Sequence, residues 1–261
     1  MQPSITILMQ GVLCSKMDIK KTIENYLKCG NVVISTYVKN DPQLISEIHE
    51  QFPDVVIIDN DLESYEKELR EIGKCGESSY FNNAFYQLKT TLAGIHSLEI
   101  STDFIVKTRV DHFYSNMDSF IQEGLLYPEK ILSSSLFVRG LTGAYHTRYH
   151  MSDCLFMGRT DLIRKAMNLA RLHYTIPVNP ESMIWRPYVR DVLQSRENNI
   201  YTLDNLPEKD YLDIMCELFH VFSVQRLEPY QLQLSSVGIV TGRMDHYPEK
   251  TTLEYLQRGV E

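Results

Sequence analysis

Cysteine is scarce in this sequence, and the cysteines that occur are scattered. There are five among 261 residues, an odd number, and no two of them form a CxxC pair. The sequence therefore gives no support for a disulfide framework or a structural zinc site, and it favours a reducing, cytoplasmic compartment. Long apolar runs are also missing, since none approaches the roughly 18 residues that a membrane-spanning helix needs. The amino-terminal apolar run is short and interrupted by Gln10, so we expect a β-strand there and not a signal peptide.

Basic residues are outnumbered by acidic ones. Lysine and arginine total 26 against 34 aspartates and glutamates, which gives a net charge of −8. This balance argues against general nucleic-acid binding, which depends on a basic surface, but it is compatible with a local basic pocket for a small phosphorylated ligand. Glycine-rich phosphate loops are missing as well. Neither GxGxxG nor GxxxxGKS follows a predicted strand, which argues against dinucleotide and P-loop nucleotide binding.

Apolar runs and amphipathic stretches alternate through the first half of the chain. We predict strands at 5–12, 31–38 and 54–61, helices at 17–30, 42–52 and 79–100, and a polar connection at 62–79. A fourth strand follows from Asp103. The apolar runs are nearly continuous, as in strands covered on both faces. This pattern predicts an α/β fold with a Rossmann-like, mostly parallel sheet flanked by helices.

The second half is predicted to add a short helix near 116–123, strands at 130–138 and 154–158, and helices at 161–173 and 179–194. An irregular loop is expected between these strands, and short strands and turns from Asn198 onward. Neither an internal repeat nor a convincing linker interrupts the chain. We therefore predict a single domain over 1–261.

Polar residues follow each of the first four predicted strands. In an open parallel sheet, ligands bind beyond the carboxyl ends of the strands. The residues expected at this edge are Gln10, Gly11, Thr36, Asp59, Asp61, Lys107, Arg109 and Asp111. Along the fourth strand, Lys107, Arg109 and Asp111 alternate with other residues and share one face.

A strand end with two basic residues followed by an acidic one suits the transfer of a sugar from a nucleotide diphosphate. The departing diphosphate must be stabilised by a divalent cation or by a Lys/Arg pair. Mg²⁺ or Mn²⁺ commonly takes only one or two protein carboxylates, and Asp111 is the expected ligand. The alternative is a salt bridge between Arg109 and Asp111 at a solvated strand end, and the spacing alone does not decide between the two.

The segments ILMQG, NNAFYQLKTTLAGI, DFIVKTRVDHFYSN, SDCLFMGRTDL and NPESMIW resemble the WavE family of lipopolysaccharide-synthesis proteins, from about Ile5 to Trp185. The resemblance implies a GT-A type glycosyltransferase with a UDP-, GDP- or CMP-linked sugar donor. Its acceptor would be a lipopolysaccharide, capsule or glycoprotein glycan, or a lipid-linked glycan, and association with the inner face of a membrane stays open. The nucleotide-sugar half would span 1–116 and the acceptor half 117–261.

The most specific part of the resemblance is K-T-R-x-D, from Lys107 to Asp111, preceded by Asn83 and Gln87. By analogy with the family, this motif occupies the place of the DxD metal-binding motif of GT-A enzymes. Arg109 stands where the first acid would be, which leaves dependence on Mn²⁺ or Mg²⁺ open.

The catalytic base is expected in the second half of the chain. Asp153 stands about where the resemblance puts an acid beside the acceptor, and it could take the proton of the acceptor hydroxyl; alternatively it caps the start of a strand. Glu181 is a competitor, although its place at a helix start favours the carboxylate and weakens it as a base. His220, in an apolar run, is a candidate second metal ligand or a hydrogen-bonded core residue. Two other functions stay open: a sugar nucleotidyltransferase, and a non-catalytic sugar-binding or scaffold subunit.

Overall fold

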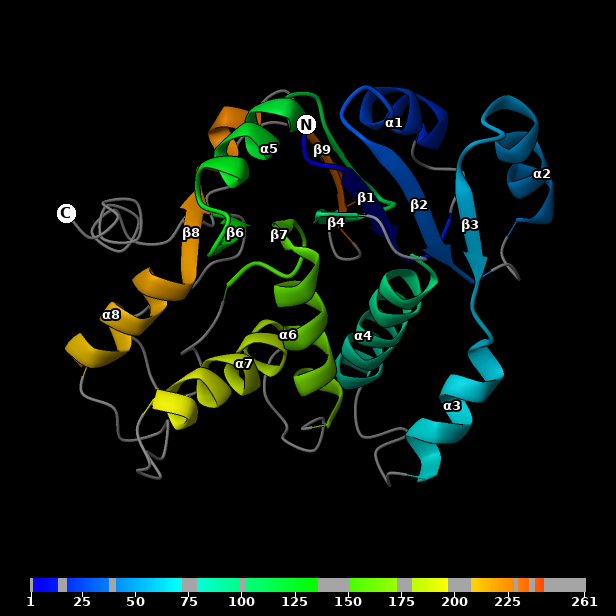
Figure 1. Cartoon of the computed structure of the whole chain (residues 1–261). Coiled ribbons are helices and arrows are strands. Elements are labelled where there is room, and N and C mark those ends of the chain that lie inside the picture. The colour runs from blue at the N-terminus through cyan, green and yellow to red at the C-terminus, as the bar shows by residue number, and fades with distance from the viewer. Residues whose placement is uncertain are drawn as a thin grey trace.

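A seven-stranded sheet forms the centre of the protein (Figure 1). The computed structural model describes residues 2–13, 18–37, 41–71, 79–98, 102–135, 151–172, 180–196, 208–227, 230–234 and 238–241. The strand order is β3-β2-β1-β4-β7-β6-β8. The strands are β1 (Ile5–Gln10), β2 (Asn31–Thr36), β3 (Val56–Asp59), β4 (Phe104–Arg109), β6 (Ile131–Ser134), β7 (Phe156–Arg159) and β8 (Phe219–Phe222).

The sheet is mixed but mostly parallel. Strands β3, β2, β1 and β4 run parallel to one another, and so do β6 and β8. Strand β7 is antiparallel to both of its neighbours, β4 and β6. Strand β6 therefore runs in the same direction as β4, and the carboxyl ends of all strands except β7 lie along one edge. The predicted α/β class and mostly parallel sheet are confirmed.

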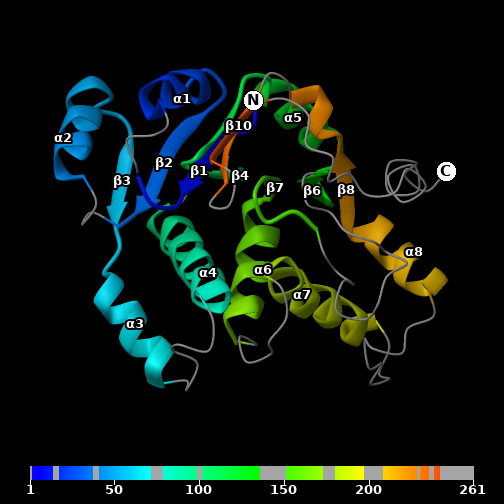
Figure 2. The same ribbon diagram turned by 180° about the vertical axis from the view of Figure 1, so that it is seen from behind.

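Helices cover both faces of the sheet (Figures 1 and 2). One face is covered by α4 (Ser79–Ser97), α6 (Thr160–Leu172) and α7 (Pro180–Arg196), and the other by α1 (Ile19–Tyr26), α2 (Pro42–Gln51) and α5 (Met117–Leu126). Two further helices are α3 (Leu62–Glu71) and α8 (Glu208–Leu218). Helices α1 and α2 begin at Asp18 and Asp41, whose carboxylates accept from backbone N–H groups of the first turn and so satisfy donors that the helix leaves unpaired.

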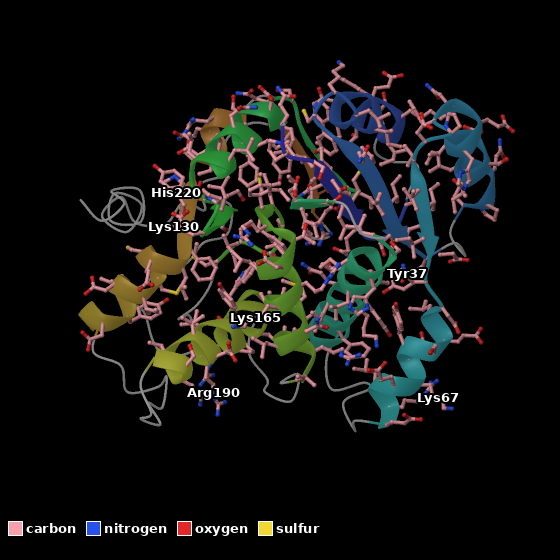
Figure 3. All side chains as sticks on the ribbon, viewed as in Figure 1. Tyr37, Lys67, Lys130, Lys165, Arg190 and His220 are labelled. Carbon is pink, nitrogen blue, oxygen red and sulfur yellow. The ribbon has the colours of Figure 1, made fainter. Side chains whose placement is uncertain are left out.

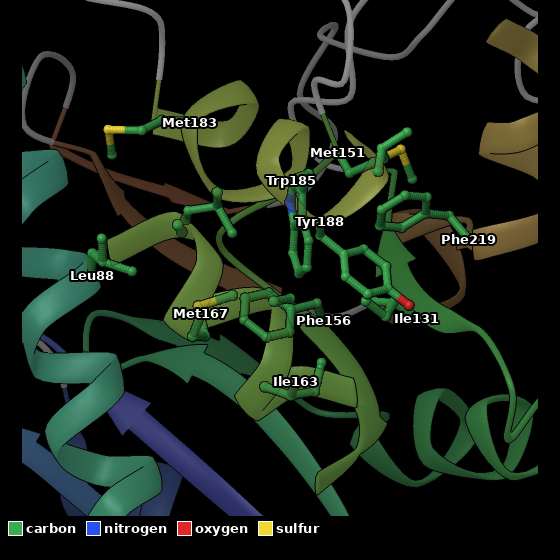
Figure 4. Packing of buried hydrophobic residues seen from close by; sticks show 14 of the residues in the cluster. Leu88, Ile131, Met151, Phe156, Ile163, Met167, Met183, Trp185, Tyr188 and Phe219 are labelled. Atoms are coloured by element: carbon green, nitrogen blue, oxygen red, sulfur yellow. The ribbon is translucent and has the colours of Figure 1, made fainter. Parts of the chain in front are cut away.

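Alternation along the strands divides the buried side chains between two cores. In β4, Ile105 packs against the α4 side, whereas Phe104 and Val106 pack on the α1 side, as the period of two requires. On the α4 side, the Trp185 ring lies edge-on to Phe156 and Phe219, with ring centroids 4.9 and 5.5 Å apart (Figure 4). By the same alternation, Lys107 and Arg109 lie on the α4 face.

A second, three-stranded antiparallel sheet joins the end of β4 to the tail. Its order is β10-β9-β5, with β5 (His112–Tyr114), β9 (Tyr230–Leu234) and β10 (Gly238–Thr241). Because β5 starts one residue after Asp111, its pairing with β9 brings the tail beside that end of the large sheet. A 3₁₀ turn, η3 (Val224–Leu227), follows β8.

Several sequence predictions need correction or limits. The tail was expected to hold only short strands and turns, but Glu208–Leu218 form the helix α8. The polar stretch after Asp61 is not a simple connection, because its first ten residues form α3, with Leu69 buried against the core. The predicted loop over 139–153 lies outside the described residues up to His150. Both halves of the chain contribute strands to one sheet, and the functional division at 116 stays a prediction.

In the described part of the chain, none of the helices has the length and apolar character to cross a membrane.

Candidate functional site

The parallel strands bring their carboxyl ends to one edge in close register. Gln10 pairs with Arg109 on one side and with Ser35 on the other. Strand β7 runs the opposite way, so it begins at this edge, with Phe156 opposite Lys107. Asp153 precedes β7 and therefore reaches the end of β4. We use the name β4 cluster for the group Gln10, Gln87, Lys107, Arg109, Asp111 and Asp153.

Lys107 is a buried cation at the base of the β4 cluster. Its residue is only 1% exposed, and its ammonium donates a hydrogen bond to the backbone carbonyl of Asp153. Burial lowers the pKa of Lys107 from 10.5 to about 8, although the nearby Asp153 carboxylate opposes this change. The ammonium is therefore covered by protein and lies against the segment that contains Asp153, and a role of Lys107 in donor binding stays a prediction.

Asp153 is a buried carboxylate held on both oxygens. Oδ2 accepts from Gln87 Nε2 at 2.6 Å and Oδ1 accepts from Cys154 Sγ at 3.3 Å. Burial alone would raise the pKa of Asp153, but the charges of Lys107 and Arg109 and these hydrogen bonds hold it below its usual value. The group is therefore ionised at neutral pH and is a weaker base than an exposed aspartate. Gln87 also reaches the Asp153 carbonyl at 3.3 Å, so it positions this segment.

Arg109 and Asp111 form a two-pronged ion pair at the end of β4. Nε of Arg109 lies 2.8 Å from Oδ1 and Nη2 lies 2.7 Å from Oδ2 of Asp111. Burial would lower the pKa of Arg109, but Asp111 raises it above its usual value. Burial would raise the pKa of Asp111, but Arg109 holds it down. The structure therefore contains the Arg109–Asp111 salt bridge that the sequence left open as an alternative. With 34% of its side chain exposed, Arg109 is the cation of this cluster that a ligand can reach.

Gln10 and Gly11 shape the neighbouring strand end. Gln10 is buried beside Arg109, and its Oε1 has no hydrogen-bond partner among the described residues. A buried acceptor without a partner costs about 1–3 kcal/mol, so this oxygen marks a place where a donor would be stabilised. Gly11 has φ of 129° and donates from its N–H to the Ser35 carbonyl. Its conformation is one that only glycine adopts readily.

The other predicted strand-end residues do not join the β4 cluster. Thr36 is buried, and its Oγ1 accepts from the Leu13 N–H at 3.3 Å, which holds the segment after β1. Asp59 ends the edge strand β3, three strand spacings from β4, or roughly 14 Å. Asp61 accepts from the Glu63 N–H at 3.0 Å at the start of α3. Asn83 lies on α4 and Glu181 on α7, and both side chains fall outside the described set.

His220 is not brought to Asp111. It lies on β8, also three strand spacings from β4. Its pairing with Leu132 puts it on the α5 face, opposite to Lys107. There its Nε2 lies 2.9 Å from Glu123 Oε1, and its ring stacks on Tyr127 at 4.2 Å. Figure 3 shows it across the sheet from Tyr37, which follows β2. One ion could not be held by both His220 and Asp111, and the geometry is that of a hydrogen-bonded core histidine.

The residues at this edge do not fit a resident divalent cation. In the described parts of the chain, no three His, Cys, Asp or Glu side chains are grouped to hold a metal. This observation alone does not exclude a metal site, because Mg²⁺ needs only one or two protein carboxylates. The Arg109 fork is decisive, since it engages both oxygens of Asp111 and places a fixed positive charge where the ion would bind.

Sequence reasoning missed the serines that position Asp153. At the end of β6, Ser133 Oγ accepts from the Ser152 N–H at 3.0 Å, and the Ser134 N–H donates to the Leu155 carbonyl at 3.0 Å. Ser152 Oγ in turn accepts from the Cys154 N–H at 3.3 Å. Three consecutive serines in an otherwise apolar strand were the available signal, because buried hydroxyls need partners.

Comparisons with known proteins give low similarities. No protein-family model and no curated protein matches the chain, so the resemblance to the WavE family stays a prediction. A solved 4-diphosphocytidyl-2C-methyl-D-erythritol synthase from Anaerococcus prevotii is 10% identical, with a TM-score of 0.45, covering 98% of this chain and 97% of that one. Mouse xyloside xylosyltransferase 1, in its apo form, is 8% identical, with a TM-score of 0.42, covering 85% of this chain and 86% of that one. At these values the likeness does not discriminate between functions.

Proposed function

We propose that the protein transfers a sugar from a nucleotide-sugar donor to a glycan acceptor, as a GT-A type glycosyltransferase. One observation supports this most directly. The β4 cluster contains an accessible guanidinium, Arg109, and a buried, ionised carboxylate, Asp153, which accepts a hydrogen bond from Gln87 and whose backbone carbonyl accepts one from Lys107. Buried charge is costly unless it is paired, and such clusters at the carboxyl edge of a sheet are characteristic of functional sites.

In this proposal the donor's diphosphate lies against Arg109. Guanidinium is suited to phosphate oxygens because it offers several N–H groups in one plane. Negative charge develops on the diphosphate as the sugar departs, and a cation already fixed in place stabilises that charge without reorganisation. Lys107 adds positive potential from beneath the same edge of the sheet.

Asp153 would accept the proton of the acceptor hydroxyl. Asp153 is ionised, as a base must be, although its lowered pKa makes it a weaker base, and its hydrogen bonds fix its orientation. The resemblance to the WavE family adds a finer expectation, that the acceptor is a lipopolysaccharide or related glycan. Gln10 and Gly11 would lie beside the nucleotide, with Thr36 behind them.

The test is a ligand screen followed by an activity assay. UDP-, GDP- and CMP-linked sugars are added at increasing concentrations in thermal-shift experiments, since a true donor raises Tm with concentration. Donors that do so are incubated with glycan acceptors, and free nucleotide is measured. The expected result is stabilisation by one nucleotide class and release of the nucleotide only when acceptor is present. Arg109→Ala should abolish both effects.

Arg159→Ala is the matched control. Arg159 and Asp161 have the same spacing and the same forked contact, at 3.1 and 2.8 Å, but they lie at the other end of the sheet. Loss of activity in both variants would contradict the assignment of Arg109. Pyrophosphate release from a nucleoside triphosphate would instead identify a nucleotidyltransferase, and sugar binding without transfer a binding or scaffold subunit.

A further inference from the structure

We infer that the β4 cluster recognises diphosphate without a divalent cation, with Arg109 in the cation's place and Asp111 acting as a positioning residue for Arg109. The inference rests on the proposed function for the identity of the ligand. It assigns Asp111 a different role from the metal ligand that its place in the K-T-R-x-D motif predicts.

Both carboxylate oxygens of Asp111 are occupied by Arg109. Each one is engaged by a guanidinium N–H, at 2.8 Å and 2.7 Å. A divalent cation would have to approach one of these oxygens to roughly 2.0–2.2 Å. It would then lie directly beside a fixed positive charge, and like charges repel strongly in a partly buried site. Asp111 is suited to holding Arg109 in place and unsuited to holding a metal at the same time.

Arg109 has hydrogens that the fork to Asp111 does not use. A guanidinium carries five N–H donors, and the fork uses one on Nε and one on Nη2. The other three, two of them on Nη1, have no hydrogen-bond partner among the described residues, and the side chain is 34% exposed. These donors lie in one plane and are oriented by the fork, as bidentate recognition of phosphate requires. An arginine fixed in this way is already arranged for a diphosphate.

The other carboxylate of the β4 cluster, that of Asp153, is also occupied. Asp153 is 5% exposed, and its oxygens accept from Gln87 and Cys154. Lys107 lies against the same residue. The Asp111 carboxylate is therefore paired with Arg109, and both oxygens of the Asp153 carboxylate accept hydrogen bonds while Lys107 and Arg109 supply positive charge nearby. Neither of them is left to attract a metal ion.

The first experiment compares binding with and without metal. Isothermal titration calorimetry on the wild-type protein uses UDP, GDP, CDP and inorganic pyrophosphate, in EDTA and in MnCl₂. The expected result is a Kd for the bound diphosphates that is the same in both buffers within about twofold. A Kd weaker by about tenfold or more in EDTA would overturn the inference while leaving the proposed function intact. If pyrophosphate binds in EDTA but none of the nucleotides does, the proposed function is contradicted while the inference stands.

The second experiment measures Mn²⁺ alone, from the loss of its free-ion EPR signal. Wild-type protein should leave the signal unchanged. Arg109→Asp removes the fixed cation and creates an acid pair at 109 and 111, and it should gain Mn²⁺ binding. Arg159→Asp makes the same change at the exposed pair and should gain none. Stoichiometric Mn²⁺ binding by the wild type that Asp111→Asn removes, or an equal gain in both arginine variants, would overturn the inference.

Discussion

The burial of Lys107 should be visible as a rise in stability with pH. The pKa of this ammonium is lowered from 10.5 to about 8 in the folded protein, chiefly by burial. Between these two values the unfolded chain binds more protons than the folded one, so unfolding becomes less favourable as pH rises. Below pH 8 both states carry the proton, and above 10.5 neither does, so the effect is confined to this window.

The size of the effect follows from the same two values. The interval from 10.5 to about 8 corresponds to about 3 kcal/mol, since one pKa unit is about 1.4 kcal/mol. Lys107→Met keeps the length and apolar stem of the side chain but cannot titrate. The free energy of unfolding of wild type minus that of Lys107→Met should therefore increase by about 3 kcal/mol from pH 8 to 10.5.

Urea unfolding at several pH values, followed by circular dichroism, measures this difference. Burial also raises the pKa of Tyr26 and Tyr37, but both proteins contain these tyrosines, so their contribution cancels. Lys165→Met is the control, because its ammonium lies 2.6 Å from Asp191 while remaining 50% exposed. A difference that stays flat across the window for Lys107→Met, or one that Lys165→Met reproduces, would refute the reasoning.

Three further predictions concern the same edge of the sheet. Asp153→Asn should lower the rate of sugar transfer by about a hundredfold or more with little change in donor Kd, because the amide keeps the shape but cannot take a proton; an unchanged rate would remove Asp153 as the base. Gln87→Leu should lower the free energy of unfolding by about 1–3 kcal/mol, because it deprives a buried carboxylate of a donor, whereas Gln43→Leu, which removes an exposed contact at 3.1 Å, should have little effect in the same urea titration. Gly11→Ala should destabilise by about 1–3 kcal/mol, because φ is 129° and the added Cβ would lie 3.2 Å from Val110; a neutral result by thermal unfolding would show that the turn relaxes.

The strand ends were predictable from the sequence because their physics is local. Continuous apolar runs indicate strands buried on both faces, and alternation put Lys107 and Arg109 on one face. The structure confirms both points. The salt bridge between Arg109 and Asp111 is also among the expectations from the sequence, because alternation places both residues on one face of the strand. A surface helix such as α3 was missed because only Leu69 among its residues is fully buried, which leaves little apolar signal.

The partners of Asp153 could not be derived from local patterns. Gln87 and Asp153 are 66 residues apart in the sequence, and they meet only because β7 is antiparallel to β4. A strand of four residues carries no signal of its direction. Both residues stand in segments that carry the resemblance to a family, but the resemblance did not predict that the Gln87 amide would donate to the Asp153 carboxylate.

Two R-x-D segments in the described part of the chain show why a motif alone has little functional content. Arg109 with Asp111 and Arg159 with Asp161 make the same forked contact. Because β4 and β7 are antiparallel, Arg159 pairs with Phe104, at the start of β4, and lies roughly 17 Å along the strand from Arg109. The Arg159 pair is 53% and 62% exposed, against 34% and 17% for the Arg109 pair. Exposed ion pairs contribute little free energy because water screens their charges. Of the two pairs, the Arg109 pair is the one that lies near the charges of Lys107 and Asp153 and is partly shielded from water, so a diphosphate would be held more strongly there.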